Sequence, residues 1–198
     1  MKAVKLFIPF IAIVLSFISC SKDKQTPQKL DPITKEYFDF KDGSVYVYTE
    51  VSDTNLTYVY TTQGYINTQA NPDIENNEIM TYDIVCAGQP VLTMRCESGG
   101  AQFKDRIALI TRFNDTTVIG PITFNVGGVF STGVNSFDSV KQHATYTING
   151  QVFNDVVRIK PYQNQKYKEI FYSKNIGLVA RRENNGKFYY LKRWSVKR

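Results

Sequence analysis

Residues 142–159 read QHATYTINGQVFNDVVRI, and this stretch decides the fold class. Two runs rich in Val, Ile, Thr and aromatic residues flank Asn149-Gly150, which is the strongest short-range signal for a two-residue β-hairpin. Asn and Gly tolerate the positive φ angles that such a tight turn needs. The stretch therefore predicts two antiparallel strands, Gln142–Ile148 and Val152–Ile159.

Similar runs, bounded by Gly, Asn, Asp or Pro, lie on both sides of this hairpin. They predict further strands at Ser44–Val51, Asn55–Gln63, Glu78–Cys86, Val91–Glu97, Ile107–Phe113, Thr116–Ile119, Tyr167–Ser173, Ile176–Arg182 and Lys187–Val196. Only Asp31–Phe40 favours a short helix, and the glycine-containing stretch 120–141 is predicted to be a long irregular loop. We therefore expect an all-β fold, an antiparallel meander of about ten strands that forms a curved sheet, a half-barrel or a flattened barrel.

The last predicted strand is apolar on both faces. Phe188, Tyr190 and Trp194 share one face at a period of two, and Tyr189 and Leu191 share the other. Such a strand is covered on both sides, by the core on one side and by a second layer or a ligand cavity on the other. Tyr190 and Trp194 are therefore candidate ligand contacts, with ordinary core packing as the alternative.

Length and composition narrow the class of protein. The 198 residues are 42% hydrophobic and 21% charged, which predicts one globular domain and excludes a disordered chain, a coiled coil and a multispan membrane protein. One His and three Cys leave little material for a metal site, and no phosphate-binding glycine loop is present. We expect no cofactor and no metal.

The N-terminus has the layout of an export signal. Two lysines within the first five residues precede an apolar run, 6–18, which is shorter than the roughly 20 residues that a membrane-spanning helix needs. The run ends in Phe17-Ile18-Ser19-Cys20, which resembles the lipobox of bacterial lipoproteins, with Phe17 where that family usually has Leu. The resemblance implies that residues 1–19 are a lipoprotein signal peptide and that Cys20 becomes an acylated N-terminus, carrying fatty acids such as palmitate.

Several acyl chains anchor a protein stably, whereas one chain holds it only marginally. We therefore expect membrane lipid to be a partner through Cys20. The next residues, Ser21-Lys22-Asp23-Lys24, are similar to a Lys-then-acid signal by which one Gram-negative phylum sends lipoproteins to the cell surface, with Lys24 replacing its second acid. The expected location is the cell envelope, on the outer membrane, with a surface-exposed and a periplasmic orientation both open.

The mature chain divides into a tether and a domain. Residues 20–36 are polar and contain two prolines, which predicts a flexible tether, and residues 37–198 are expected to form a single β domain. Its C-terminal stretch, from Tyr146 through Tyr172-Ser173-Lys174-Asn175-Ile176-Gly177-Leu178-Val179 to Trp194, resembles small surface lipoproteins of the same phylum that end in a β-meander. That resemblance implies an antiparallel sheet and an envelope role, and it transfers no catalytic residue.

The two cysteines that remain after acylation are Cys86 and Cys96. Export to an oxidising compartment favours a disulfide between them. A hairpin turn centred near Gln89 pairs Cys86 with Leu92 instead, so two buried free thiols are the equal alternative. The spacing does not match a Cys-x-x-Cys metal or redox motif.

Signs of catalysis or nucleic-acid binding are weak. His143 has no nucleophile motif beside it, and no pair of carboxylates is marked out. Removing residues 1–19 takes away two of the 24 basic residues and none of the 18 acids, which leaves a net charge of +4. No nucleic-acid-binding motif accompanies this charge, so we expect no nucleic-acid partner.

These observations predict a membrane-anchored, non-enzymatic β domain. It either binds an apolar ligand such as a lipid inside a curved sheet, as lipoprotein-carrier half-barrels do, or serves a structural role in the envelope. A surface module that binds a glycan or a protein is the alternative, and a hydrolase ranks below both. The sequence leaves the oligomeric state open.

Overall fold

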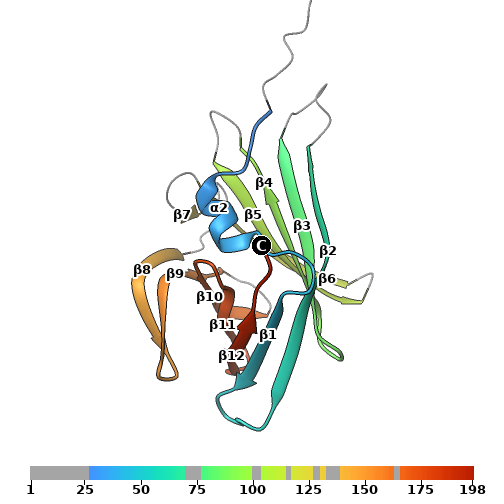
Figure 1. Cartoon of the computed structure of the whole chain (residues 1–198). Helices are drawn as coiled ribbons and strands as arrows, with labels where there is room; N and C mark the ends of the chain where they lie inside the picture. The colour runs from blue at the N-terminus through green and yellow to red at the C-terminus, as the bar shows by residue number, and fades with distance from the viewer. Residues whose placement is uncertain are drawn as a thin grey trace, which may run out of the picture.

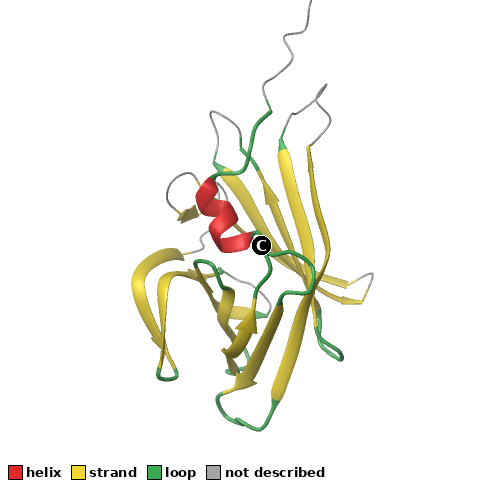
Figure 2. Cartoon of the chain, in the orientation of Figure 1, coloured by secondary structure: helices red, strands yellow, loops and turns green. Residues whose placement is uncertain are grey.

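The computed structural model describes residues 27–69, 77–99, 104–114, 117–126, 130–132, 139–162 and 166–198. Within them the chain is all-β, with one short helix and twelve strands in one curled sheet (Figures 1 and 2). The elements are α2 (Pro32–Phe38), β1 (Val45–Glu50), β2 (Thr57–Gln69), β3 (Glu78–Val85), β4 (Val91–Glu97), β5 (Asp105–Asn114), β6 (Thr117–Val126), β7 (Phe130–Thr132), β8 (Ser139–Ile148), β9 (Gln151–Lys160), β10 (Tyr167–Ser173), β11 (Gly177–Glu183) and β12 (Phe188–Ser195).

The strand order is β7-β6-β5-β4-β3-β2-β1-β12-β11-β10-β9-β8. Every strand pairs antiparallel with its neighbours in this order. The first and last strands, β1 and β12, lie side by side in the middle of the sheet. The two edges of the sheet are β7 and β8, which approach each other in space, so the sheet curls into a half-barrel. The predicted meander is confirmed.

The stretch 120–141 was expected to be an irregular loop, and this prediction is wrong. Strand β6 continues to Val126, β7 follows, and β8 begins at Ser139. Glycines ordinarily weaken a strand. Here β6 continues past Gly120 through a register shift: Ile119 pairs with Thr111 and Ile122 with Leu109, and the ladder resumes beyond it.

The Asn149-Gly150 hairpin forms as predicted. Asn149 has a φ of 48° and Gly150 a φ of 80°, and Ile148 pairs directly with Gln151. These positive angles let two residues reverse the chain between β8 and β9. The turn thus sets the register of the whole pair, which runs without a shift from Ser139 opposite Lys160 to the tip.

Helix α2 closes one end of the half-barrel, beside the C-terminus (Figure 1). Asp31 caps it by accepting a hydrogen bond from the Ile33 N–H at 2.8 Å, and Pro32 occupies the first turn. The short helix predicted in this region is confirmed. Ordered contacts begin inside the stretch that the sequence assigns to the tether, since Leu30 is only 3% exposed.

The sheet is packed on both faces. We call the face that carries the buried rings of Tyr46, Tyr48, Tyr60, Tyr82 and Tyr172 the inner face. At its closed end Phe38 contacts Tyr172 and Phe40 contacts Tyr46. We call the opposite face of β10, β11 and β12 the outer face.

The outer face carries a second set of rings. The β8–β9 hairpin folds back so that Tyr146 meets Phe171 of β10 at 5.2 Å between ring centroids, and Phe153 meets Trp194 of β12 at 6.0 Å. Phe171 also contacts Phe188 at 6.3 Å. The second layer is therefore a hairpin of the same chain.

Candidate functional site

The structure describes the candidate residues in the β domain but not those at the N-terminus. The signal peptide 1–19 and the acylation residue Cys20 lie outside the described residues. Among the described residues no helix has the length and apolar character to cross a membrane. In the same part of the chain, His, Cys, Asp and Glu side chains do not gather in a group of three that would suit a metal ion.

Cys86 and Cys96 are both buried and free, so the disulfide, one of the two alternatives, is not formed. The β3–β4 register explains why. Ile84 pairs with Leu92 and Met80 pairs with Cys96, so the two thiols belong to different positions along the hairpin. Burial raises the pKa of both thiols, which keeps them protonated and poorly reactive.

The two candidate ligand contacts on β12 differ in exposure. Tyr190 is half-buried and packs against the core, whereas 39% of Trp194 is exposed, with its ring against Phe153. Tyr189 and Leu191, expected on the opposite face, are buried. A register shift in β12 pairs Tyr190 with Thr49 and Trp194 with Tyr46, so the prediction that Tyr190 and Trp194 share one face is wrong. Trp194 adjoins the outer-face cluster through Phe153, which pairs with Tyr146. His143 also joins that cluster, 5.0 Å from the Tyr146 ring.

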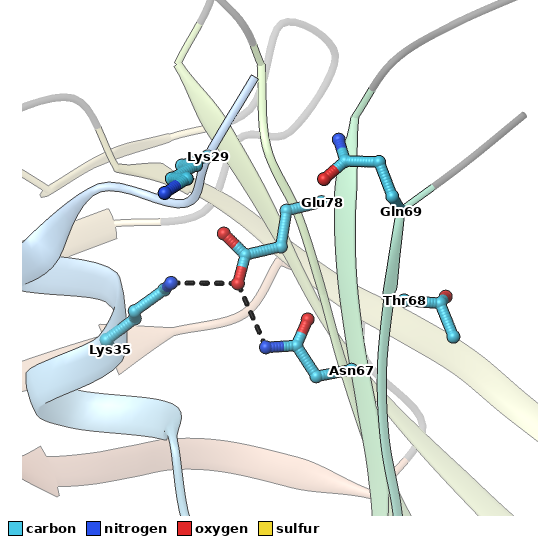
Figure 3. Close-up of a pocket in the computed structure, with 6 residues that line it drawn as sticks. All are labelled: Lys29, Lys35, Asn67, Thr68, Gln69 and Glu78. Atoms are coloured by element: carbon cyan, nitrogen blue, oxygen red, sulfur yellow. Dashed lines mark hydrogen bonds and ion pairs between the residues drawn. The ribbon is translucent and has the colours of Figure 1, made fainter. Parts of the chain in front are cut away.

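A polar pocket of about 300 Å³ lies beside the closed end (Figure 3). Its lining residues are Lys29, Lys35, Asn67, Thr68, Gln69 and Glu78. Glu78 is fully partnered there: its carboxylate is 2.8 Å from the Lys35 Nζ, and it accepts hydrogen bonds from the Asn67 amide at 3.0 Å and the Leu30 N–H at 2.9 Å.

These partners decide what the pocket can do. Burial alone would raise the pKa of Glu78, but Lys35, the Leu30 N–H and Asn67 together hold it below its ordinary value. Glu78 is therefore ionised, and a general acid would need the opposite shift. The carboxylate fastens the start of α2 to β3, which is a structural role.

A second site lies on the inner face, close to the end of β11. The side chain of Arg181 is almost completely buried, with 3% of the residue exposed. Its guanidinium carbon lies 4.6 Å from the ring centroid of Tyr189, 5.0 Å from that of Tyr60 and 5.4 Å from that of Tyr48. We call these three residues the tyrosine cage.

The polar partners of Arg181 are few. Its Nη2 donates a hydrogen bond to the Tyr60 hydroxyl at 2.7 Å. Its Nε and Nη1 are buried and have no hydrogen-bond partner. Arginine remains charged in proteins, so a cation with two unsatisfied nitrogen atoms lies in an aromatic surrounding.

Further polar groups surround the cage. Burial lowers the pKa of Lys166, and the charge of Arg181 lowers it further, while Glu183 at 3.8 Å acts in the opposite direction. Burial raises the pKa of Tyr167 to about 12, so its hydroxyl stays neutral. Arg181 and Lys166 thus place two positive charges near one another, with Glu183 as a nearby acid.

The sequence contains a signal for the burial of an arginine at this position. Arg181 and Arg182 follow the apolar run Leu178-Val179-Ala180 within one predicted strand. Adjacent residues of a strand point to opposite faces, so one of two neighbouring arginines had to face the core. Which one it is depends on the register of β11.

Comparisons with known proteins assign no function to the polar pocket or to the Arg181 site. No protein-family model, curated protein or solved structure matches the chain.

Proposed function

We propose that the chain is an envelope lipoprotein, anchored in the outer membrane by acylated Cys20, whose non-catalytic β domain binds an apolar or amphipathic ligand against its inner face. The anchor is supported by the signal-like run 6–18 and the lipobox-like ending at Ser19-Cys20. The binding role is supported by the form of the sheet.

One observation carries the binding role: a single curled sheet encloses an aromatic inner face, and its edges β7 and β8 approach each other without forming a ladder. A barrel closed by hydrogen bonds resists opening, because every backbone group in its wall is paired. Unpaired edges can separate without breaking a ladder, which gives an apolar chain a route to the inner face.

Photolabelling tests this role on the full chain in its own membrane. A palmitic acid analogue with a diazirine on its chain is added to envelopes, irradiated, and the modified residues are mapped by mass spectrometry. We expect adducts on inner-face residues, such as Tyr60, Met80 and Met94, that excess palmitate suppresses. Adducts confined to outer-face residues such as Tyr146, or adducts that palmitate does not suppress, contradict the binding role.

A second candidate, a glycan- or protein-binding surface, is favoured by one observation. Trp194 presents 39% of its surface next to the exposed cations Lys192 and Arg193. Aromatic rings with polar neighbours are common at recognition surfaces. The stability of Trp194→Ala distinguishes a packing role of this ring from a recognition role.

A further inference from the structure

Arg181 is a buried cation whose hydrogen-bonding groups are only partly satisfied. Buried polar groups almost always have hydrogen-bond partners, and a buried cation costs far more free energy than a buried neutral group unless an anion faces it. Arg181 makes one hydrogen bond, to the neutral hydroxyl of Tyr60, and its Nε and Nη1 make none.

The tyrosine cage compensates for only part of this cost. Aromatic faces attract the positive charge. They do not accept hydrogen bonds in the plane of the guanidinium, where the N–H groups of Nε and Nη1 point. What the site lacks is therefore an acceptor, and the local charge favours a negative one: Lys166 adds a second cation, and the nearby Glu183 lies 3.8 Å from Lys166.

We propose that Arg181 binds the carboxylate of a fatty-acid-like ligand, with the ligand's apolar chain along the inner face. This inference rests on the proposed binding function and adds the chemical class of the head group. A carboxylate matches the site in charge, since its single negative charge balances the single unpaired guanidinium. One of its oxygens accepts from Nε or from Nη1, which lie on different edges of the guanidinium.

Entry requires the cage to open. Arg181 is two residues from the end of β11, and Tyr189 is one residue from the start of β12. Strand β12 runs toward the C-terminus beside α2, so the turn that joins β11 to β12 lies away from α2 (Figure 1). The Tyr189 ring lies nearest to the guanidinium and contacts the half-buried Tyr58 at 5.5 Å. Tyr189 is therefore the ring that would have to rotate for a ligand to reach the guanidinium.

The test compares two photoreactive probes of equal chain length, a fatty acid and the corresponding fatty alcohol, on the full chain in envelopes. A charge-assisted hydrogen bond to Arg181 would favour the acid. The acid should therefore label the inner face at a concentration about tenfold or more below the concentration that the alcohol needs. In Arg181→Met the acid should lose this advantage and label like the alcohol. Arg182→Met is the matched control, because Arg182 lies on the outer face against Phe188 and Glu169, and it should keep the advantage.

The outcomes separate this inference from the proposed function. If neither probe labels the inner face of the wild type, the binding function itself is contradicted, and the inference fails with it. If both probes label the wild type equally, the inner face binds apolar chains and Arg181 does not select a carboxylate. The wild-type comparison needs no variant, so it decides even if Arg181→Met fails to fold. If a folded Arg181→Met variant loses inner-face labelling equally for both probes, Arg181 has a structural role and the inference is overturned.

Discussion

At the residue scale, two neighbouring arginines show how strand geometry separates identical side chains. Arg181 points to the inner face and lies in the tyrosine cage with two unpaired nitrogen atoms. Arg182 points to the outer face, stacks on Phe188 and donates to Glu169 at 3.2 Å. The same residue type thus serves two roles one position apart: one is an unbalanced cation, and the other belongs to an ion-pair network.

Trp194 and Leu191 provide a residue-scale prediction. Leu191 is completely buried, so Leu191→Ala should lower the free energy of unfolding by about 2–5 kcal/mol. Trp194 is partly exposed and its ring contacts Phe153, so Trp194→Ala should cost only about 1–2 kcal/mol. Thermal melts of both variants measure this order. A Trp194→Ala melting point equal to that of the wild type would contradict the packing and favour a recognition role for the ring.

At the element scale, α2 depends on tertiary contacts. A seven-residue helix is too short to be stable in water by itself. Asp105 of β5 accepts from the Asp31 N–H at 2.7 Å and from the Thr34 hydroxyl at 2.6 Å, and the Tyr37 hydroxyl donates to the Asp155 carbonyl at 2.8 Å. These bonds connect the helix to β5 and β9, so α2 fastens distant parts of the sheet at the closed end.

Glu169 joins three strands and provides an element-scale prediction. It lies on β10 and forms ion pairs with Arg158 of β9 and Arg182 of β11. Burial alone would raise the pKa of Glu169, but these two cations hold it below its ordinary value of 4.5. A lowered folded-state pKa means that the carboxylate stabilises the fold above the unfolded-state pKa, and this contribution is lost as the pH falls through the folded-state pKa.

Glu169→Gln should therefore lower the free energy of unfolding at pH 7 by about 1–3 kcal/mol, and the difference from the wild type should shrink below about pH 4.5. Urea unfolding at a series of pH values measures both effects. Glu97→Gln is the control, because Glu97 pairs with the exposed Arg106 and should change stability by less than about 1 kcal/mol. A pH-independent effect of Glu169→Gln would show that the ion pairs do not stabilise the fold.

At the scale of the whole molecule, the proposed anchor and the half-barrel act together. If Cys20 is acylated as proposed, the anchor holds the domain at a membrane and brings the inner face near a source of acyl chains. Cys20→Ala should leave the chain without its acyl groups and move it from the membrane fraction to the soluble fraction, because the anchor supplies the membrane affinity. Fractionation followed by immunoblotting measures this shift. Ser21→Ala is the matched control and should stay with the membrane; an unchanged membrane fraction for Cys20→Ala would contradict the lipoprotein proposal.

The sequence by itself determined the class of fold and most strand positions. Turn chemistry at Asn149-Gly150 and alternation along runs such as Val45–Tyr48 are local properties, so they can be recognised without knowing the partner strands. The short helix near Asp31 was also predictable from its own residues. The strand at Phe130–Thr132 was missed, because a short, glycine-flanked edge strand depends on the neighbour that pairs with it.

Only the tertiary structure decided which distant segments meet. The pairing of β1 with β12 and the burial of Arg181 beside Tyr48 and Tyr60 join residues more than a hundred positions apart. The folding of the β8–β9 hairpin over the outer face also joins segments that are not neighbours in the sequence. Alternation shows that Arg181 and Arg182 point in opposite directions, but it does not show which face is enclosed. That choice follows from the curl of the sheet, because curling buries one face around α2 and leaves the other for a second layer.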